Sequence, residues 1–127
     1  MDTRAATLPA DPREEMQTRT PRPWQRFGDR YPAVVAAYDT LRDACMEAGP
    51  LDESAVALVK LAVSVGAGAE RTVHMHSKKA LRAGVDPDAL RHVALLALPT
   101  IGLPAALDAL CWVDESIQEV RCAERRG

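Results

Sequence analysis

The sequence predicts an all-α domain, a bundle of about five to six helices. From Tyr31 onward, apolar residues recur at the three- and four-residue spacing of a helix, and no segment alternates with period two for long enough to predict a strand. Glycine and proline separate the apolar segments, as they do at helix ends. The chain has 127 residues, of which 47% are hydrophobic, and this is enough for one domain with its own core.

Residues 1–28 are predicted to form a Pro/Arg-rich N-terminal arm, and residues 29–127 the helical domain. The stretch Thr20–Pro23 cannot continue a helix, because proline lacks the backbone N–H donor and restricts the residue before it. The arm ends with Trp24 and Phe27, which are too apolar for a fully solvated linker. We therefore expect the end of the arm to pack on the domain or on a neighbouring subunit.

The first two helices of the domain are expected over about residues 32–48 and 52–65. Pro32 stands where a first-turn proline is tolerated, and Gly49 and Pro50 end the first helix. Asp52 is a good N-cap for the second, because its carboxylate can accept a hydrogen bond from a free backbone N–H.

Three more helices are expected over about residues 69–83, 86–98 and 102–121. Gly84 ends the third helix, and Pro99 is expected to end the fourth. The last helix carries one apolar stripe, formed by Leu103, Leu107, Leu110, Val113, Ile117 and Val120. Trp112 projects away from this stripe, which suggests a second interface. Together with the apolar end of the arm, it predicts a homo-oligomer.

The formal net charge of −2 disfavours nucleic acid and anionic membranes as partners, because neither would find a basic patch. No apolar run is long enough to span a bilayer or to act as a signal core, so we expect a cytoplasmic protein. The odd set of Cys45, Cys111 and Cys122 indicates free thiols. Cys45 shares a stripe with Val34 and Leu41 and is expected to be buried.

His74 and His76 are the residues that first suggest chemistry. On a helix they point about 200° apart and cannot share one metal ion, and no carboxylate set is apparent near them, so we expect no metal. His76 lies among small side chains, and is either a core histidine or the wall of a pocket. His74 is expected to face solvent or a subunit contact, paired with Glu70 four residues earlier.

Lys60 is the single charged residue between Glu53 and Glu70. It is either a surface lysine with a buried aliphatic stem or a pocket group. In a pocket, desolvation would lower its pKa and make it a usable acid or base.

Two motifs carry a resemblance to a known family: Gly68-x-Glu70-x5-His76-x3-Ala80-x3-Gly84 and Gly102-Leu103-Pro104-Ala105. Over roughly residues 31–120 the chain resembles the carboxymuconolactone decarboxylase family and, more loosely, the alkylhydroperoxidase-D-like proteins. The resemblance implies an alkylhydroperoxidase-D-like helical bundle that assembles as trimers or hexamers with sites near subunit contacts. It also makes His76 the motif histidine, and places Glu70 where the decarboxylase branch has an acid.

The chain departs from both branches of that family. Ala69 and Thr72 occupy the positions of the peroxidase Cys-x-x-Cys pair, and Ala57 stands in place of its proton-relay glutamate. Thr100 replaces the tyrosine that the decarboxylases carry near the Gly-x-Pro motif. The resemblance therefore leaves both family reactions without some of their groups.

Three functions compete at this point. The first is a cofactor-free, lyase-like acid/base enzyme on a small carbonyl, lactone or carboxylate, with His76 as general base, Glu70 orienting a group or accepting a proton, and Lys60 binding an anion or polarising a carbonyl. The second is a non-catalytic oligomeric binding or scaffold protein. The third is a thiol-dependent antioxidant enzyme that uses Cys111 or Cys122.

Overall fold

The computed structural model describes residues 22–127, and the predicted arm before residue 22 lies outside the described part. Residues 22–127 form six helices: α3 (Arg22–Arg30), α4 (Pro32–Glu47), α5 (Glu53–Ala67), α6 (Glu70–Arg82), α7 (Pro87–Ile101) and α8 (Leu103–Arg126). These residues contain no strand, which confirms the all-α prediction for this part of the chain.

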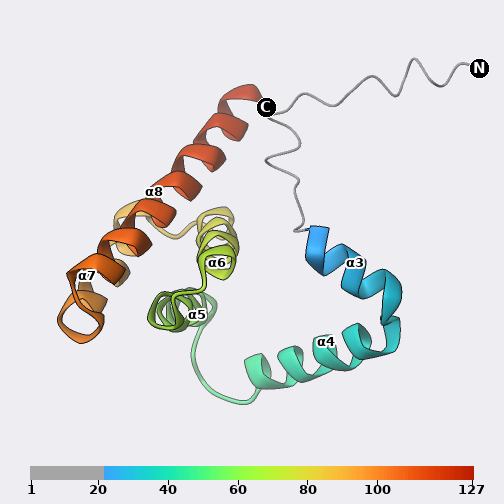
Figure 1. Ribbon diagram of the computed structural model, residues 1–127. Coiled ribbons are helices and arrows are strands. Elements are labelled where there is room, and N and C mark those ends of the chain that lie inside the picture. The colour runs from blue at the N-terminus through green and yellow to red at the C-terminus, as the bar shows by residue number, and fades with distance from the viewer. Residues whose placement is uncertain (1–21) are drawn as a thin grey trace, which may run out of the picture.

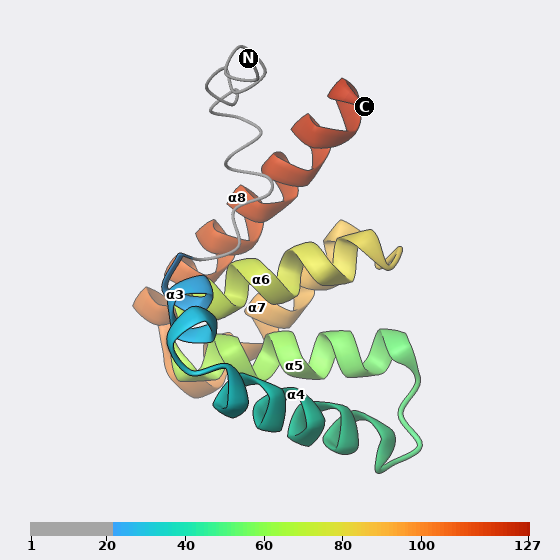
Figure 2. The same cartoon turned by 90° about the vertical axis from the view of Figure 1, so that its right-hand side faces the viewer.

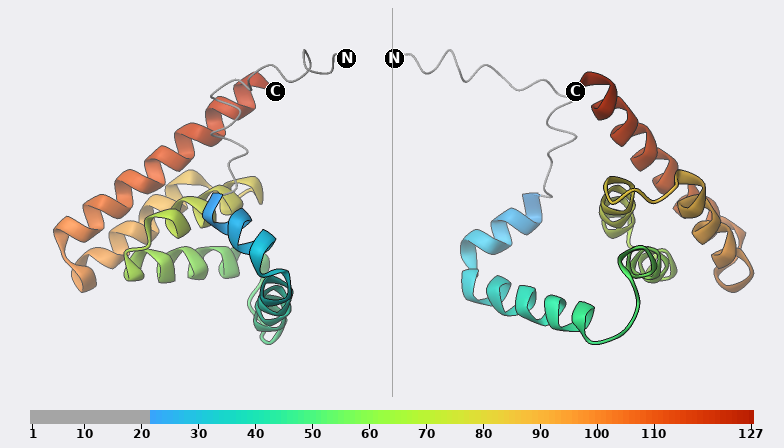
Figure 3. Two further views of the ribbon diagram at one scale, coloured as in Figure 1. Left: turned by 45° about the vertical axis from the view of Figure 1, so that its right-hand side comes forward. Right: turned by 180° about the vertical axis from the view of Figure 1, so that it is seen from behind.

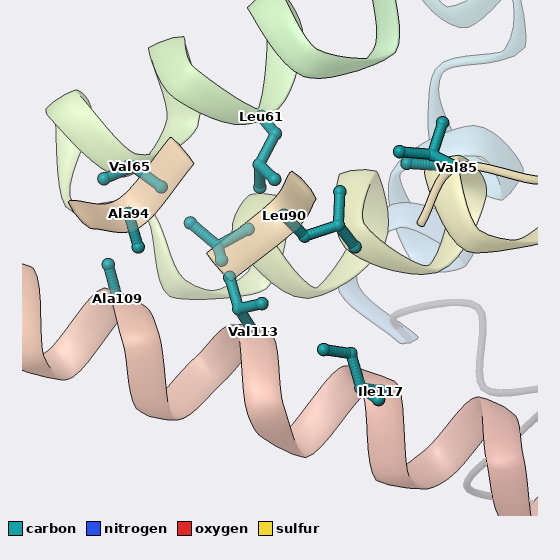
Figure 4. Close-up of a cluster of buried hydrophobic side chains, with 10 residues drawn as sticks. Leu61, Val65, Val85, Leu90, Ala94, Ala109, Val113 and Ile117 are labelled. Carbon is teal, nitrogen blue, oxygen red and sulfur yellow. The ribbon is translucent and has the colours of Figure 1, made fainter. Parts of the chain in front are cut away.

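Helices α5 to α8 form the body of the domain (Figure 1). Each helix packs against two others: α5 against α6 and α7, and α8 against the same two. Their shared core contains the apolar side chains of Leu61, Val65, Val73, Ala80, Val85, Leu90, Ala94, Ala109, Val113 and Ile117 (Figure 4). Burial of these side chains stabilises the packing of the four helices against one another.

Helices α3 and α4 lie apart from the body, joined to it through the segment before α5 (Figures 1 and 3). They pack on each other instead. Trp24 stacks on Phe27 and meets Tyr38 edge-on, both with ring centroids 5.8 Å apart. The end of the predicted arm is thus helical and packs on α4, rather than on the body of the same chain.

Helix α4 has no buried residue, although its sequence carries an apolar stripe. Cys45 is exposed, which corrects the expectation that it is buried. Tyr38 and Leu41 lie on this apolar stripe, and their side chains are 50% and 59% exposed. The core of the body closes without α4, so within the described residues the stripe stays largely exposed, although Tyr38 contacts Trp24 of α3.

Several helix ends agree with their predicted signals. Asp52 accepts a hydrogen bond from the N–H of Ala55 at 2.8 Å, and Asp86 accepts one from Asp88 at 2.7 Å. Gly84, at the end of α6, has φ +93°, a conformation that other residues rarely adopt.

Helix α7 does not stop before Pro99 as expected. It continues to Ile101, and Gly102 closes its last turn by donating to the carbonyl of Leu98 at 3.0 Å. Pro99 has no N–H to donate to the carbonyl of Leu95, and the helix continues for only two residues beyond it.

Helix α8 is longer than predicted and projects past its neighbours (Figure 2). Val113, Ile117 and Val120 of its stripe are buried, but Leu103 and Leu107 are exposed. Trp112 is half-buried against the core, so it is not the free outward contact that the sequence suggested. Within residues 22–127, no helix is both long enough and apolar enough to cross a membrane.

Candidate functional site

A cavity of about 510 Å³ lies between α4, α5 and α6, with Lys60 and His76 in its wall. Lys60 comes from α5 and His76 from α6, two helices that pack together in the body. Ala57 and Ala83 also line the cavity and leave space beside the imidazole. This is the placement that the helical spacing of His76 and its small neighbours predicted.

Cations surround His76 in this cavity. Lys79 lines it from α6 and Arg42 from α4. Burial of the imidazole lowers the pKa of His76, and the charges of Lys60 and Lys79 lower it further. The neutral imidazole, a proton acceptor, is therefore the favoured form at neutral pH.

Lys79 is subject to the same effects. Burial is the main cause of the lowered pKa of Lys79, and the charges of Arg42 and Lys60 lower it further. Arg42 is partly neutralised by Asp39 at 3.5 Å and Asp43 at 3.7 Å. The ion pairs within the described residues involve neither Lys60 nor Lys79.

The cavity also has acidic and apolar sides. Asp43, Glu47 and Glu53 contribute carboxylates to its lining. An adjoining groove of about 370 Å³ between α4 and α5 is lined mainly by apolar side chains, and shares Arg42 and Lys60 with the cavity. Together the two spaces suit a small molecule with an anionic end and an apolar end.

Glu70 is not part of this cavity. Its carboxylate lies beside His74, with 3.8 Å between Oε2 and Nε2. Of the three predicted catalytic residues, the structure therefore brings His76 and Lys60 together and places Glu70 elsewhere. Glu70 and His76 are six residues apart, so they point in different directions on one helix.

His74 makes more contacts than the surface pair that was expected. The predicted i, i+4 approach to Glu70 is present, but the imidazole also packs against α8, where it contacts Glu115 and Ser116. Its side chain is only 21% exposed. His74 therefore does not face open solvent, because α8 lies over that face of α6, and the alternative expectation of a subunit contact stays a prediction.

Lys79 and Arg42 are cavity residues that the sequence argument missed. Lys79 is three residues after His76, so its helical spacing could have identified it. Arg42 is 18 residues before Lys60 and on a helix that stands off the body, and no local pattern indicates its position.

The thiols lie away from the His76 cavity. Cys111 and Cys122 are exposed on α8, and Cys45 lines the neighbouring apolar groove. Ala69 and Thr72, at the positions of the peroxidase cysteine pair, carry no redox-active group.

Neither the comparison with curated proteins nor the comparison with solved structures gives a significant match. A family model does match the chain, that of the carboxymuconolactone decarboxylase family, over residues 32–115. The matched segment contains the motif histidine His76, the Gly102-Leu103-Pro104-Ala105 motif and most of the helical body. Because it covers well over half of the chain, this protein belongs to the carboxymuconolactone decarboxylase family.

Proposed function

We propose that this chain is a cofactor-free acid/base enzyme that acts on a small carboxylate with a carbonyl or lactone group. The observation that carries the proposal is a neutral imidazole in a cavity with two lysines that have no acidic partner among the described residues. Ammonium groups without an acidic partner favour an anionic ligand, since its charge offsets their mutual repulsion.

The proposed reaction is proton transfer at carbon. His76 takes a proton from the carbon beside the carbonyl group, and the electron pair of that C–H bond moves onto the carbonyl oxygen. The charge of Lys60 stabilises this oxygen, while Lys79 and Arg42 hold the carboxylate. The electron pair then returns from the oxygen, and the imidazolium gives its proton back to the same carbon or, in an unsaturated substrate, to the carbon at the far end of the conjugated double bond, so that no redox partner or cofactor is needed.

Binding of simple acids tests the recognition part of this proposal. Small oxo acids and carboxylated lactones are expected to bind, whereas the corresponding amides are not, as measured by saturation-transfer NMR. Lys60→Met is expected to weaken binding at least about tenfold, because it removes one unpaired charge at the cavity.

Arg82→Met is the matched control, since Arg82 is an exposed cation on α6 outside the cavity lining. It should bind the acids as the wild type does. Equal binding of acids and amides, or wild-type affinity in Lys60→Met, would contradict the proposal and favour the scaffold function.

We further propose that the chain forms a closed homo-oligomer, a trimer or hexamer as in the family it resembles. The exposed apolar side chains of α4 and α5 support this, among them Tyr38, Leu41, Val59 and Val63. A free monomer would leave this surface in water, and a second copy can cover it. Because α4 also carries Arg42, a copy that fixes α4 would fix one wall of the cavity.

Light scattering is expected to give a mass of three or six chains at micromolar concentration. Leu41→Asp should lower that mass, because a carboxylate on the exposed stripe of α4 would be buried without a partner in the oligomer. Thr40→Asp, on the same exposed helix but outside the apolar stripe, serves as the control. A monomeric wild type would rule out the assembly.

A further inference from the structure

Three side chains with metal-binding atoms converge where α6 contacts α8. Nε2 of His74 lies 3.3 Å from Oε1 of Glu115 and 3.8 Å from Oε2 of Glu70. The three ligand atoms all lie within 4.8 Å of one another. The proposed acid/base reaction uses none of these residues, and none lines the His76 cavity.

The hydrogen bonds behind His74 determine which ring nitrogen is free. Oγ of Ser116 donates its one hydrogen to the carbonyl of Trp112 at 3.1 Å. It therefore accepts a hydrogen bond from Nδ1 of His74, which is 2.8 Å away. With the proton on Nδ1, the neutral imidazole has its lone pair on Nε2.

That lone pair is directed toward two carboxylates. A ring nitrogen with a free lone pair beside two carboxylate oxygens is a set of donor atoms that can bind a metal cation. Histidine ligands of metal ions commonly have this arrangement, with the second ring nitrogen held by a hydrogen bond from behind. Ser116 is fully buried, so it holds the ring from inside the protein.

The spacing between His74 and Glu115 fits a tetrahedral ion, whereas the full set of ligand atoms, within 4.8 Å of one another, would have to draw closer together. In a zinc site with ligand distances of about 2.0–2.2 Å, neighbouring ligand atoms are about 3.3 to 3.6 Å apart. The 3.3 Å between His74 and Glu115 is already at this value. The carboxylate of Glu70 is only 0.5 Å farther from His74 than that of Glu115 and is exposed, so a small rotation brings it into place.

We propose that Glu70, His74 and Glu115 bind one Zn²⁺ ion that joins α6 to α8, with water as the fourth ligand. One imidazole and two carboxylates are typical zinc ligands, whereas Ca²⁺ takes six to eight oxygen ligands, more than this site offers. Because Glu70 and His74 come from α6 and Glu115 from α8, the ion would act as a structural cross-link. The proposal does not depend on the proposed reaction.

Titration of tag-free, chelator-treated protein with ZnCl₂ tests the site. We expect one zinc ion per chain in isothermal titration calorimetry, and a rise in melting temperature of about 5 °C or more at a hundredfold excess over the dissociation constant. Co²⁺ in place of zinc should give the strong visible absorption of a tetrahedral ion.

The variants separate this site from other zinc-binding groups. Glu115→Gln and Glu70→Gln each remove a ligand charge at nearly constant shape, and each should weaken zinc binding at least about tenfold. Ser116→Ala keeps all three ligands but frees the ring, and should weaken binding about 10- to 100-fold. Glu119→Gln, on α8 where it pairs with Lys78 of α6, is the matched control and should bind zinc like the wild type.

Two results would overturn the proposal. One is the absence of saturable zinc binding to the wild type. The other is a combined result, in which both glutamine variants bind zinc with wild-type affinity and replacing Cys45, Cys111 and Cys122 by serine abolishes zinc binding. That result would place the zinc on the exposed thiols.

Discussion

Replacing His76 with alanine is expected to lower the rate of proton exchange at the substrate carbon by about a hundredfold or more, the usual contribution of a general base. The reaction can be followed by NMR in D₂O as the loss of the proton signal beside the carbonyl group of the oxo acids and lactones that bind. His76 is the one imidazole in the cavity lining, so no second histidine can replace it there.

The pH dependence of the same reaction gives an independent check on His76. Burial and the charges of Lys60 and Lys79 lower its pKa below 6.5, and a general base is active only when deprotonated. The rate should therefore be constant from neutral pH down past 6.5 and fall only in more acidic solution. In Lys60→Met one of the lowering charges is gone, so the fall should begin at a higher pH.

His92→Ala provides the control for both measurements, because His92 is exposed on α7 and outside the cavity. It should leave the rate and the pH profile unchanged. Exchange that survives in His76→Ala, or an inflection at or above pH 6.5 in the wild type, would exclude His76 as the base.

Leu90→Ala is expected to lower the free energy of unfolding by about 2 to 5 kcal/mol, the usual effect of removing a large side chain from a packed core. Leu90 is 0% exposed and packs within the core of the body. A small domain has only about 5 to 15 kcal/mol of stability in total, so this variant should be close to the limit of folding.

Leu96→Ala is the matched control, because Leu96 lies on the same helix and is 65% exposed. Urea unfolding at one protein concentration should show a change within about 0.5 kcal/mol for this variant. The mass of both variants by light scattering shows whether assembly has changed as well. If Leu90→Ala and Leu96→Ala lowered the free energy of unfolding by similar amounts, the core would not lie where the structure places it.

The sequence predicted the helical elements well because their signals are local. Asp52 and Asp86 cap helices with their own side chains, and Gly84 adopts a conformation that suits glycine. The side-by-side placement of Lys60 and His76 could also be predicted, since it follows from helical spacing and from the contact between consecutive helices. Pro99 misled the prediction only by a few residues, since α7 ends at Ile101, two residues beyond it.

Features that depend on distant parts of the chain could not be predicted in this way. The apolar stripe of α4 indicated burial, yet Cys45 is exposed, because periodicity shows that a face is apolar but not which surface covers it. Glu115 lies 41 residues after His74, and its approach to that ring depends on how α8 crosses α6. The residues close to His74 in the sequence therefore gave no indication of Glu115.

In the oligomer proposed above, the separation of α4 from the body would make folding and assembly two different kinetic events. The buried core residues of the described part lie between Leu61 and Val120, in helices that follow one another along the chain, so the body can form quickly from near neighbours in a step independent of concentration. A second copy can reach α4 only by diffusion, in a step whose rate rises with concentration. In the interval the newly folded chain would expose the apolar side chains of α4, and during that time it would be most open to encounters with other proteins.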